Sequence, residues 1–198
     1  AVTFDNTGTL NLGNASGDSF TFNGGLTEST TGTVTLASTI ISSNDAISFG
    51  AVTLGSNTTI DTNASSTTGD LTLGVVTGGS NTLTLSTGDN VANSDITASG
   101  NISGVTTLTL SDVGGTATFA GDVDVTTVSV DNTVANVALN GDGSSVTNAV
   151  SFANDGTLQL GDASGDTLTF NGGLTTTSVG GTVTLNGTID TSNDAITL

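Results

Sequence analysis

The chain lacks eight residue types altogether: Lys, Arg, His, Cys, Met, Trp, Tyr and Pro do not occur among its 198 residues. Without His or Cys, the usual nucleophile–histidine pairs and imidazole or thiolate metal sites are excluded. Without Lys or Arg, nucleic acids and anionic membrane surfaces are poor partners, because both are bound through basic side chains. We therefore expect a protein that is not an enzyme.

The charged groups that do occur are all acidic. The chain has 18 Asp and Glu residues, with Glu28 as the only Glu, and a formal net charge of −18. Charged residues nevertheless make up only 9% of the chain, and Val, Ile and Thr are abundant. Disordered chains combine high charge with few β-branched residues, whereas these residues suit a pleated, half-buried surface. No apolar run approaches about 18 residues, so no membrane insertion is expected.

A long internal repeat organises the sequence. Residues 2–49 and 150–198 are identical at about two-thirds of their positions, with one inserted residue and an offset of about 148 residues. The second copy stops at Leu198, the position that matches Phe49, after which the first copy continues. We expect a segment of a longer array, or a subunit whose end continues into the start of the next subunit.

Short runs of alternating apolar residues recur throughout the chain and predict an all-β fold. Two residues per period is the spacing of a strand with one buried face. Gly, Asn, Asp and Ser separate the runs and favour turns. The runs are Leu10/Leu12, Phe20/Phe22, Val34/Leu36, Ile47/Phe49, Val52/Leu54, Leu71/Leu73, Leu83/Leu85, Leu108/Leu110, Ala117/Phe119, Val123/Val125, Val128/Val130, Val137/Leu139, Val150/Phe152, Leu158/Leu160, Leu168/Phe170 and Val183/Leu185.

These strands are too short, and their turns too irregular, for regular hairpins. They favour a right-handed parallel β-solenoid, a single continuous unit over residues 1–198, with a β-sandwich array as the alternative. Successive runs predict roughly 18–25 residues per coil. At about 4.8 Å per coil, roughly eight to ten coils form a rod about 40–50 Å long. A near-constant 148-residue period also predicts an integral number of coils per repeat.

Three phrases carry a family resemblance: Gly32-Thr-Val-Thr-Leu36, Asn57-Thr-Thr-Ile-Asp61 and Asn23-Gly-Gly-Leu26, in a cysteine-free chain rich in Thr, Gly, Asn and Asp. In this texture the chain resembles bacterial surface solenoids of the filamentous-haemagglutinin and autotransporter types. The resemblance covers the whole chain. It implies a secreted right-handed β-helix that serves as an adhesin stalk or filament, without implying a receptor.

Carboxylates are the only groups that could carry metal or acid–base chemistry. Asp122 and Asp124 flank one strand position, about 6.6 Å apart by strand rise, close to the spacing of an inverting glycosidase pair. No basic side chain accompanies them, which argues against catalysis. Calcium takes oxygen ligands and would relieve the uncompensated charge. The candidate ligands are Asp122, Asp124, Asp142, Asp162 and Asp166. The alternative is that these residues only shape turns.

Outward threonines suggest a further alternative. Thr-x-Thr recurs with the intervening apolar residues facing inward, so both threonines face out, and stacking on one flat face would resemble an ice-binding solenoid. Threonine is also simply a good outward strand residue. The pairs are Thr33/Thr35, Thr82/Thr84, Thr107/Thr109, Thr116/Thr118, Thr167/Thr169 and Thr182/Thr184.

The sequence thus predicts an extracellular or cell-surface structural protein. Its main partner is itself, because the unpaired edges of a solenoid's end coils are covered most simply by more of the same protein, end to end. The resulting assembly would be a filament, fibre or sheath. The alternatives are an adhesin stalk segment that contacts cell-surface glycans and, less favoured, an ice-binding solenoid. No cofactor is required, with calcium as the candidate ion.

Overall fold

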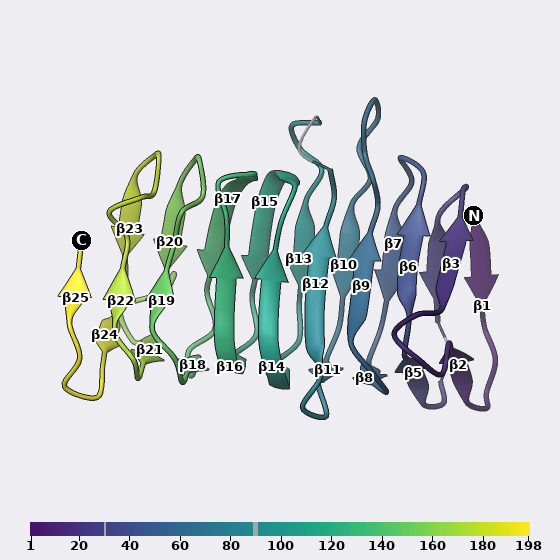
Figure 1. The fold of residues 1–198 in the computed structure, drawn as a ribbon, viewed down its shortest axis with the longest axis horizontal. Helices are drawn as coiled ribbons and strands as arrows, with labels where there is room; N and C mark the ends of the chain where they lie inside the picture. The colour runs from purple at the N-terminus through teal and green to yellow at the C-terminus, as the bar shows by residue number, and fades with distance from the viewer. Residues whose placement is uncertain (30, 89–90) are drawn as a thin grey trace.

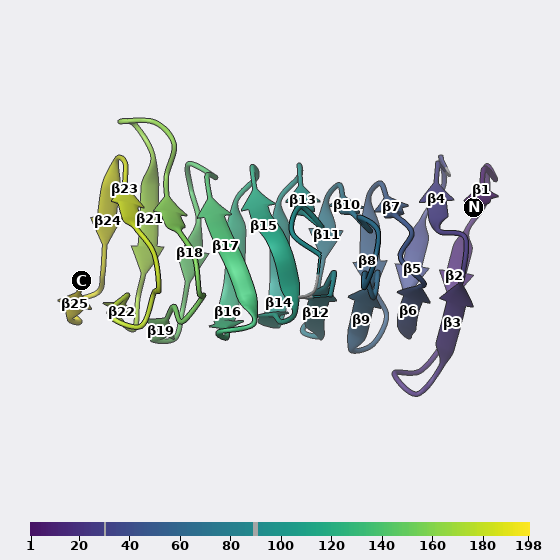
Figure 2. The ribbon, with the colours of Figure 1, turned by 90° about the horizontal axis from the view of Figure 1, so that it is seen from above.

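The computed structural model describes residues 1–29, 31–88 and 91–198. The chain winds as a parallel β-solenoid of nine coils that stack along one axis from the N-terminus to the C-terminus (Figure 1). Figure 2 shows the same succession of coils from above. None of the described residues forms a helix with the length and hydropathy needed to cross a membrane.

Each coil has three sides, which we call face 1, face 2 and face 3. Face 1 consists of β1 (Val2–Phe4), β4 (Leu26–Glu28), β7 (Ile47–Phe49), β10 (Leu71–Leu73), β13 (Ile96–Ala98), β15 (Val113–Phe119), β17 (Val134–Leu139), β20 (Leu158–Leu160) and β23 (Val183–Leu185).

Faces 2 and 3 share two long strands that bend from one face to the other, β14 (Ile102–Leu110) and β16 (Val123–Val130). Face 2 contains the first halves of these strands together with β2 (Leu10–Leu12), β5 (Val34–Leu36), β8 (Val52–Leu54), β11 (Val76–Thr77), β18 (Ser145–Val146), β21 (Thr167–Phe170) and β24 (Thr188–Asp190). Face 3 contains their second halves together with β3 (Ser19–Phe22), β6 (Thr39–Ser42), β9 (Thr58–Asp61), β12 (Thr82–Ser86), β19 (Val150–Ser151), β22 (Leu174–Thr175) and β25 (Ile196–Thr197).

The coil length lies within the predicted range. Ala117 pairs with Val137, 20 residues later, whereas Leu71 pairs with Ile96, 25 residues later. All pairings between the described strands are parallel, and each strand of the interior coils is bonded to its counterparts in the coils before and after it. The predicted all-β solenoid is therefore confirmed, and antiparallel hairpins packed as a sandwich are not what these strands form.

Inward side chains form apolar columns that run the length of the rod. On face 1 one column is in continuous register: Val2, Leu26, Ile47, Leu71, Ile96, Ala117, Val137, Leu158 and Val183. Its interior members are fully buried, as are the large side chains Phe49, Phe119, Phe152 and Phe170. Because each residue packs mainly on its counterparts one coil away, small side chains suffice to build this core.

The corner between face 3 and face 1 carries the longest excursions of the described chain, residues 63–69 and the described residues 88 and 91–94, which rise above the rod in Figure 1. At the base of each excursion, a buried threonine hydroxyl donates a hydrogen bond to a backbone carbonyl. The Thr62 hydroxyl donates to the Gly69 carbonyl, and the Thr87 hydroxyl donates to the Ser94 carbonyl at 2.9 Å. These side chains are fully buried, and their bonds replace the ladder that the excursions interrupt.

The repeat does not contain an integral number of coils, contrary to the prediction. Its seven strands all move by one face between the copies: β1 lies on face 1 but its counterpart β19 on face 3, β2 on face 2 but β20 on face 1, and β3 on face 3 but β21 on face 2. From β1 to β19 the chain passes six coils and two further faces. All three faces accept the same inward alternation, so packing does not require whole coils.

Candidate functional site

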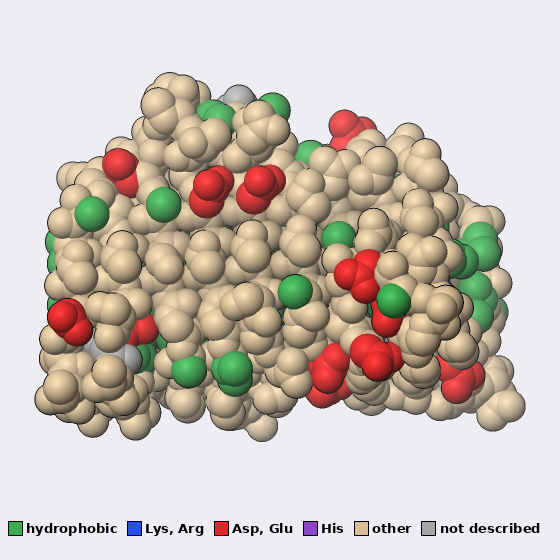
Figure 3. All heavy atoms as spheres, turned by 180° about the vertical axis from the view of Figure 1, so that it is seen from behind, with side chains coloured by type: hydrophobic (Ala, Val, Ile, Leu, Met, Phe, Trp, Pro, Cys, Tyr) green, Lys and Arg blue, Asp and Glu red, His purple; other side chains and the backbone are tan. Residues whose placement is uncertain are grey.

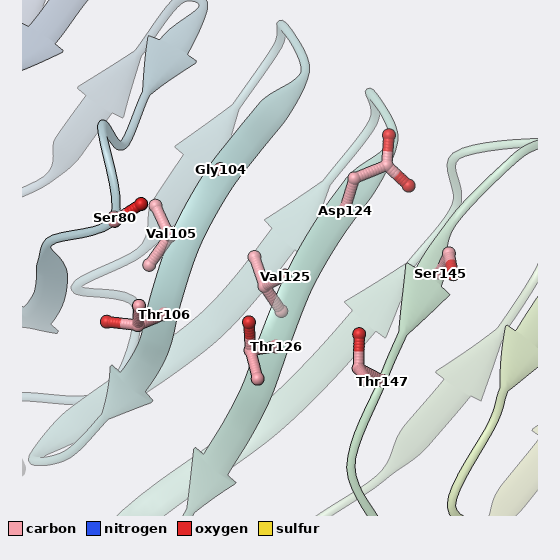
Figure 4. Close-up of a pocket in the computed structure, with 9 residues that line it drawn as sticks. All are labelled: Ser80, Gly104, Val105, Thr106, Asp124, Val125, Thr126, Ser145 and Thr147. Atoms are coloured by element: carbon pink, nitrogen blue, oxygen red, sulfur yellow. The ribbon is translucent and has the colours of Figure 1, made fainter.

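A groove crosses the corner between face 2 and face 3 (Figure 4). It forms because β14 and β16 run through this corner without a loop, while turns project in the coils on either side. The strands bend at a register shift between Ser103 and Val105. The groove has a volume of about 370 Å³ and is lined by Ser80, Gly104, Val105, Thr106, Asp124, Val125, Thr126, Ser145 and Thr147.

Five of the nine residues that line the groove carry hydroxyl groups, and one carboxylate, that of Asp124, lies at its edge (Figure 4). Partial burial raises the pKa of Asp124, the nearby negative charge of Asp122 raises it further, and a hydrogen bond from the Ser145 backbone N–H opposes both. The sequence singled out Asp124 but not the hydroxyls. Their signal was the two-residue gap between Val123/Val125 and Val128/Val130, too short for a loop.

Asp122 lies in the turn between β15 and β16, where its hydrogen bonds continue the bonding between coils beyond the ends of the strands. Its N–H donates to Asn101 Oδ1 at 3.0 Å, and its own Oδ1 accepts the N–H of Gly143 at 2.9 Å. Asp142 lies beside Gly143 in the exposed turn between β17 and β18. Asp122, one of the candidate calcium ligands, therefore already hydrogen-bonds the turn of the next coil through Gly143, while Asn101 in the preceding coil accepts its own N–H.

Asp162 and Asp166 lie elsewhere, in the turn between β20 and β21, two coils beyond Asp122. Hydrogen bonds from the backbone N–H groups of Ala163 at 2.9 Å and Asp162 at 2.7 Å hold the pKa of Asp166 below its ordinary value. In the first copy the matching turn is held by Asp18, which accepts the N–H of Asn14 at 2.9 Å. Both copies thus use this carboxylate to fold a turn.

The five proposed calcium ligands are divided between these two places. Within residues 1–29, 31–88 and 91–198, no three acidic side chains gather in a way that could hold a metal ion. Asp122 and Asp124 are close enough for their charges to interact, and no basic residue of the chain balances them. Calcium at these positions stays a prediction that the geometry neither assembles nor tests.

The outward Thr-x-Thr pairs do not stack on one flat face, contrary to the sequence expectation. Two pairs lie on each face: Thr116/Thr118 and Thr182/Thr184 on face 1, Thr33/Thr35 and Thr167/Thr169 on face 2, and Thr82/Thr84 and Thr107/Thr109 on face 3. The one-face offset between the repeat copies causes part of this dispersal, because it places Thr33/Thr35 and their counterparts Thr182/Thr184 on different sides. The six pairs therefore form no single flat array, and ice binding stays an untested prediction.

One hydroxyl column is nevertheless continuous on face 3. Its members stand in register from the first coil to the last: Ser19, Thr39, Thr59, Thr84, Thr109, Ser129, Ser151, Thr175 and Thr197. On the reverse side, acidic side chains and a few hydrophobic ones stand among uncharged polar side chains and backbone, and no Lys or Arg occurs (Figure 3). Such a surface keeps the rod hydrated and negatively charged.

The two end coils expose the inward columns that every other coil covers. Leu185 and Ile196 of the last coil are 38% and 43% exposed, whereas their repeat counterparts Leu36 and Ile47 are fully buried at 0%. At the other end, Val2 is 42% exposed, and Phe4, Leu10, Phe20 and Phe22 are only partly buried. Each end therefore presents a rim of unpaired strand edges and of apolar side chains that are exposed or partly exposed, except that Leu12 on face 2 of the first coil stays buried.

No protein-family model, no curated protein and no solved structure matches this chain. Its place among solenoid repeat proteins rests on its parallel strand pairing and its internal repeat.

Proposed function

We propose that this chain is a structural extracellular protein whose solenoid units stack end to end into a filament. The observation that carries the proposal is the pair of apolar end rims, which have the residue types and the spacing of the covered interior columns. Exposed strand edges pair with another chain unless something covers them. A second copy of this chain, or further repeats of it, would continue the existing ladder without a new type of contact.

The direction of the chain along the rod and the faces on which it begins and ends both support this stacking. Strand β25 at the C-terminal rim lies on face 3, and β1 at the N-terminal rim lies on face 1. A copy placed on the last coil with its faces aligned therefore sets Val2 and Phe4 over Val183 and Leu185. All four side chains are apolar and point inward.

Like charge opposes the same contact. Asp5 and Asp18 lie in the first coil, Asp190 and Asp194 lie in the last, and no basic residue compensates them. The Debye length falls from about 30 Å at 0.01 M salt to about 3 Å at 1 M. Filament growth by this chain should therefore increase with ionic strength.

The proposal includes an extracellular location. It also includes a relationship to filamentous-haemagglutinin-type and autotransporter-type surface solenoids, which the chain resembles. A chain without Lys or Arg offers trypsin no cleavage site, which suits long exposure outside a cell. The groove at the corner between faces 2 and 3 favours a second role, as an adhesin stalk that contacts glycans with hydroxyl groups. Binding of the isolated chain to a glycan array, abolished by Thr126→Val and Thr147→Val, would support that role.

The filament proposal is tested by electron microscopy and sedimentation velocity of the purified 198-residue chain across protein and salt concentrations. We expect single-rod filaments that lengthen with both. Ile196→Asp, which places a carboxylate on the C-terminal rim, should abolish them. Thr72→Asp adds the same charge to an exposed position in the middle of face 1 and should leave them intact. Monomeric rods under every condition, or equal filaments from Ile196→Asp, would overturn the proposal.

A further inference from the structure

A polar pocket of about 280 Å³ lies where face 3 turns toward face 1 in the third, fourth and fifth coils, all of them interior coils. It borders the ends of β9 and β12, which point toward the excursions at the top of Figure 1. The sequence singled out none of the residues that line it. They are Asp61, Asn63, Ala64, Ser65, Ser86, Gly88 and Asp112.

Hydrogen bonds to neighbouring coils hold the two turns that border this pocket. On one side, Asn44 Oδ1 in the preceding coil accepts the N–H groups of Ser65 and, at 3.0 Å, of Ser66. On the other side, the Asp112 N–H donates to Thr133 Oγ1 in the following coil at 2.7 Å. Both turns are therefore anchored to the rod.

Ser86 forms the floor of the pocket. It points outward like Thr84, because side chains two residues apart on a strand share a side. Ser86 is nevertheless only 7% exposed. Within residues 1–29, 31–88 and 91–198 its hydroxyl has no hydrogen-bond partner, and the only unpaired side-chain polar atom there that is fully enclosed is Asn154 Oδ1. The Ser86 hydroxyl therefore opens into the pocket with its hydrogen-bonding capacity unused.

Two carboxylates flank this hydroxyl. Asp61 is the register partner of Ser86 in the preceding coil, and Asp112 lies in the following coil, just beyond the end of β14. Asp61 Oδ1 accepts the Asn63 N–H at 2.7 Å, which leaves its second oxygen to the pocket. The Asp112 carboxylate has no hydrogen-bond partner in the part of the chain that the structure describes. No basic residue of the chain balances either charge.

These groups suit a hard cation. Calcium takes six to eight oxygen ligands from carboxylates, neutral groups and water in a flexible arrangement, whereas magnesium demands a near-ideal octahedron. The pocket supplies two carboxylates, the Ser86 hydroxyl and the Asn63 amide. At about 30 Å³ per water, a volume of about 280 Å³ also leaves room for the waters that complete the shell.

We propose that this pocket binds one calcium ion, with Asp61 and Asp112 as its carboxylate ligands and the Ser86 hydroxyl beneath the ion. The bound ion links three consecutive coils at the corner where the excursions interrupt the ladder, and it offsets the repulsion between the two carboxylates. The site is distinct from the acidic residues that the sequence singled out. It also lies away from both end coils and does not depend on stacking.

The test measures calcium uptake by the 198-residue chain in equilibrium dialysis against calcium chloride. A background of 0.15 M NaCl, where the Debye length is about 8 Å, limits diffuse attraction to the acidic surface. We expect one saturable site with a dissociation constant of about 0.1–1 mM, because it has only two charged ligands. Asp61→Asn and Asp112→Asn should each weaken binding at least about tenfold, and Ser86→Ala about threefold.

Asp45→Asn is the matched control. It removes the same charge at the same corner one coil earlier, outside the pocket, from a carboxylate that bonds to no other described residue. Calcium should raise the melting temperature of the parent chain and of Asp45→Asn, because an ion that binds only the folded state stabilises it. Asp61→Asn should melt like the parent in EDTA, since Asn keeps the oxygen that caps Asn63, but should show no rise with calcium.

Three results would overturn the proposal. Uptake that does not saturate, or falls equally in Asp45→Asn and Asp61→Asn, would show diffuse attraction alone. Saturable binding that survives both Asp61→Asn and Asp112→Asn would place the ion elsewhere on the rod. Displacement of calcium by an equal concentration of 1,4-diaminobutane would show that the pocket prefers an organic cation. Each result is independent of whether the rods stack.

Discussion

The first and last quarters of this chain contain nearly the same sequence in different surroundings. Leu36 and Ile47 are fully buried, but their counterparts Leu185 and Ile196 are more than a third exposed. The strands and turns that contain them are alike; the difference is the coil that covers them. In this fold, burial is thus a property of the neighbouring coil.

The strongest test of this comparison truncates one residue pair in turn. Ile47→Ala should cost about 2–5 kcal/mol, because it leaves a cavity between two packed coils. Ile196→Ala should cost less than about 1 kcal/mol, because the site is open. Denaturant unfolding followed by circular dichroism, at low salt and protein concentration where filaments are absent, measures both. Equal costs would show that the copies are stabilised alike and would contradict the comparison.

A second pair should behave identically in both copies. Gly25 and Gly173 adopt φ of 82° and 97°, and an added Cβ would lie 2.6 Å and 2.8 Å from the carbonyl oxygens of Ala46 and Ala195. Replacement of either glycine by Ala should therefore cost about 1–3 kcal/mol. The same denaturant-unfolding assay measures the change in the free energy of unfolding for both variants. A difference larger than about 1 kcal/mol between them would mean that the face, rather than the turn, sets the strain.

A smaller difference is expected from the capped turns. Asp166 accepts two backbone N–H bonds, whereas the bond made by Asp18 comes from Asn14. Because the folded-state pKa of Asp166 is lowered from 3.8, its stabilising effect is present above pH 3.8 and is lost as the pH falls through the folded-state pKa. Asp166→Asn should lower the melting temperature at pH 7 more than Asp18→Asn does.

The same pH argument provides the control. As the pH falls through the lowered folded-state pKa of Asp166, the parent chain loses the ionised carboxylate, so its melting temperature and that of Asp166→Asn should converge. A deficit in Asp166→Asn that stays constant as the pH is lowered until the parent chain itself stops losing stability would show that the carboxylate charge does not hold this turn.

The smallest effects are expected where the repeat has room. Gly17 and Gly165 are matched turn glycines with no atom within 4 Å of an added Cβ. Ala at either position should raise stability by about 0.4–1 kcal/mol, since it restricts the unfolded chain without straining the folded one. Loss of stability at Gly165 alone would reveal a restriction on the second copy that the first lacks.

Much of the architecture could be predicted from local patterns. Paired apolar residues such as Val34/Leu36 and Leu71/Leu73 indicated strands with one buried face, and their spacing indicated coil length. The face that each strand occupies could not be predicted, since it depends on how many turns precede it. Nor could the inward position of Glu28, whose carboxylate accepts the Gly50 N–H at 3.1 Å where the second copy has Thr176.

The candidate site residues were also predictable only in part. Asp122 and Asp166 were recognisable as turn residues, and their bonds agree with that alternative. Whether they meet other carboxylates depends on stacking between coils, which spacing along the chain does not give. The groove around Thr126 and Thr147 forms where two coils without a loop at this corner lie beside coils that have one. Its shape therefore depends on residues of neighbouring coils, about 21 residues apart in the sequence, and no single motif predicts it.

The one-face offset has a consequence for how a long array of this repeat meets its environment. Any mark on the surface, such as a hydroxyl cluster or an attached sugar, reappears one side further round with each period. It returns to its starting side after three periods, or twenty coils, a rise of about 96 Å at about 4.8 Å per coil. A cell or particle that touched such a fibre from any direction would find the same mark within reach.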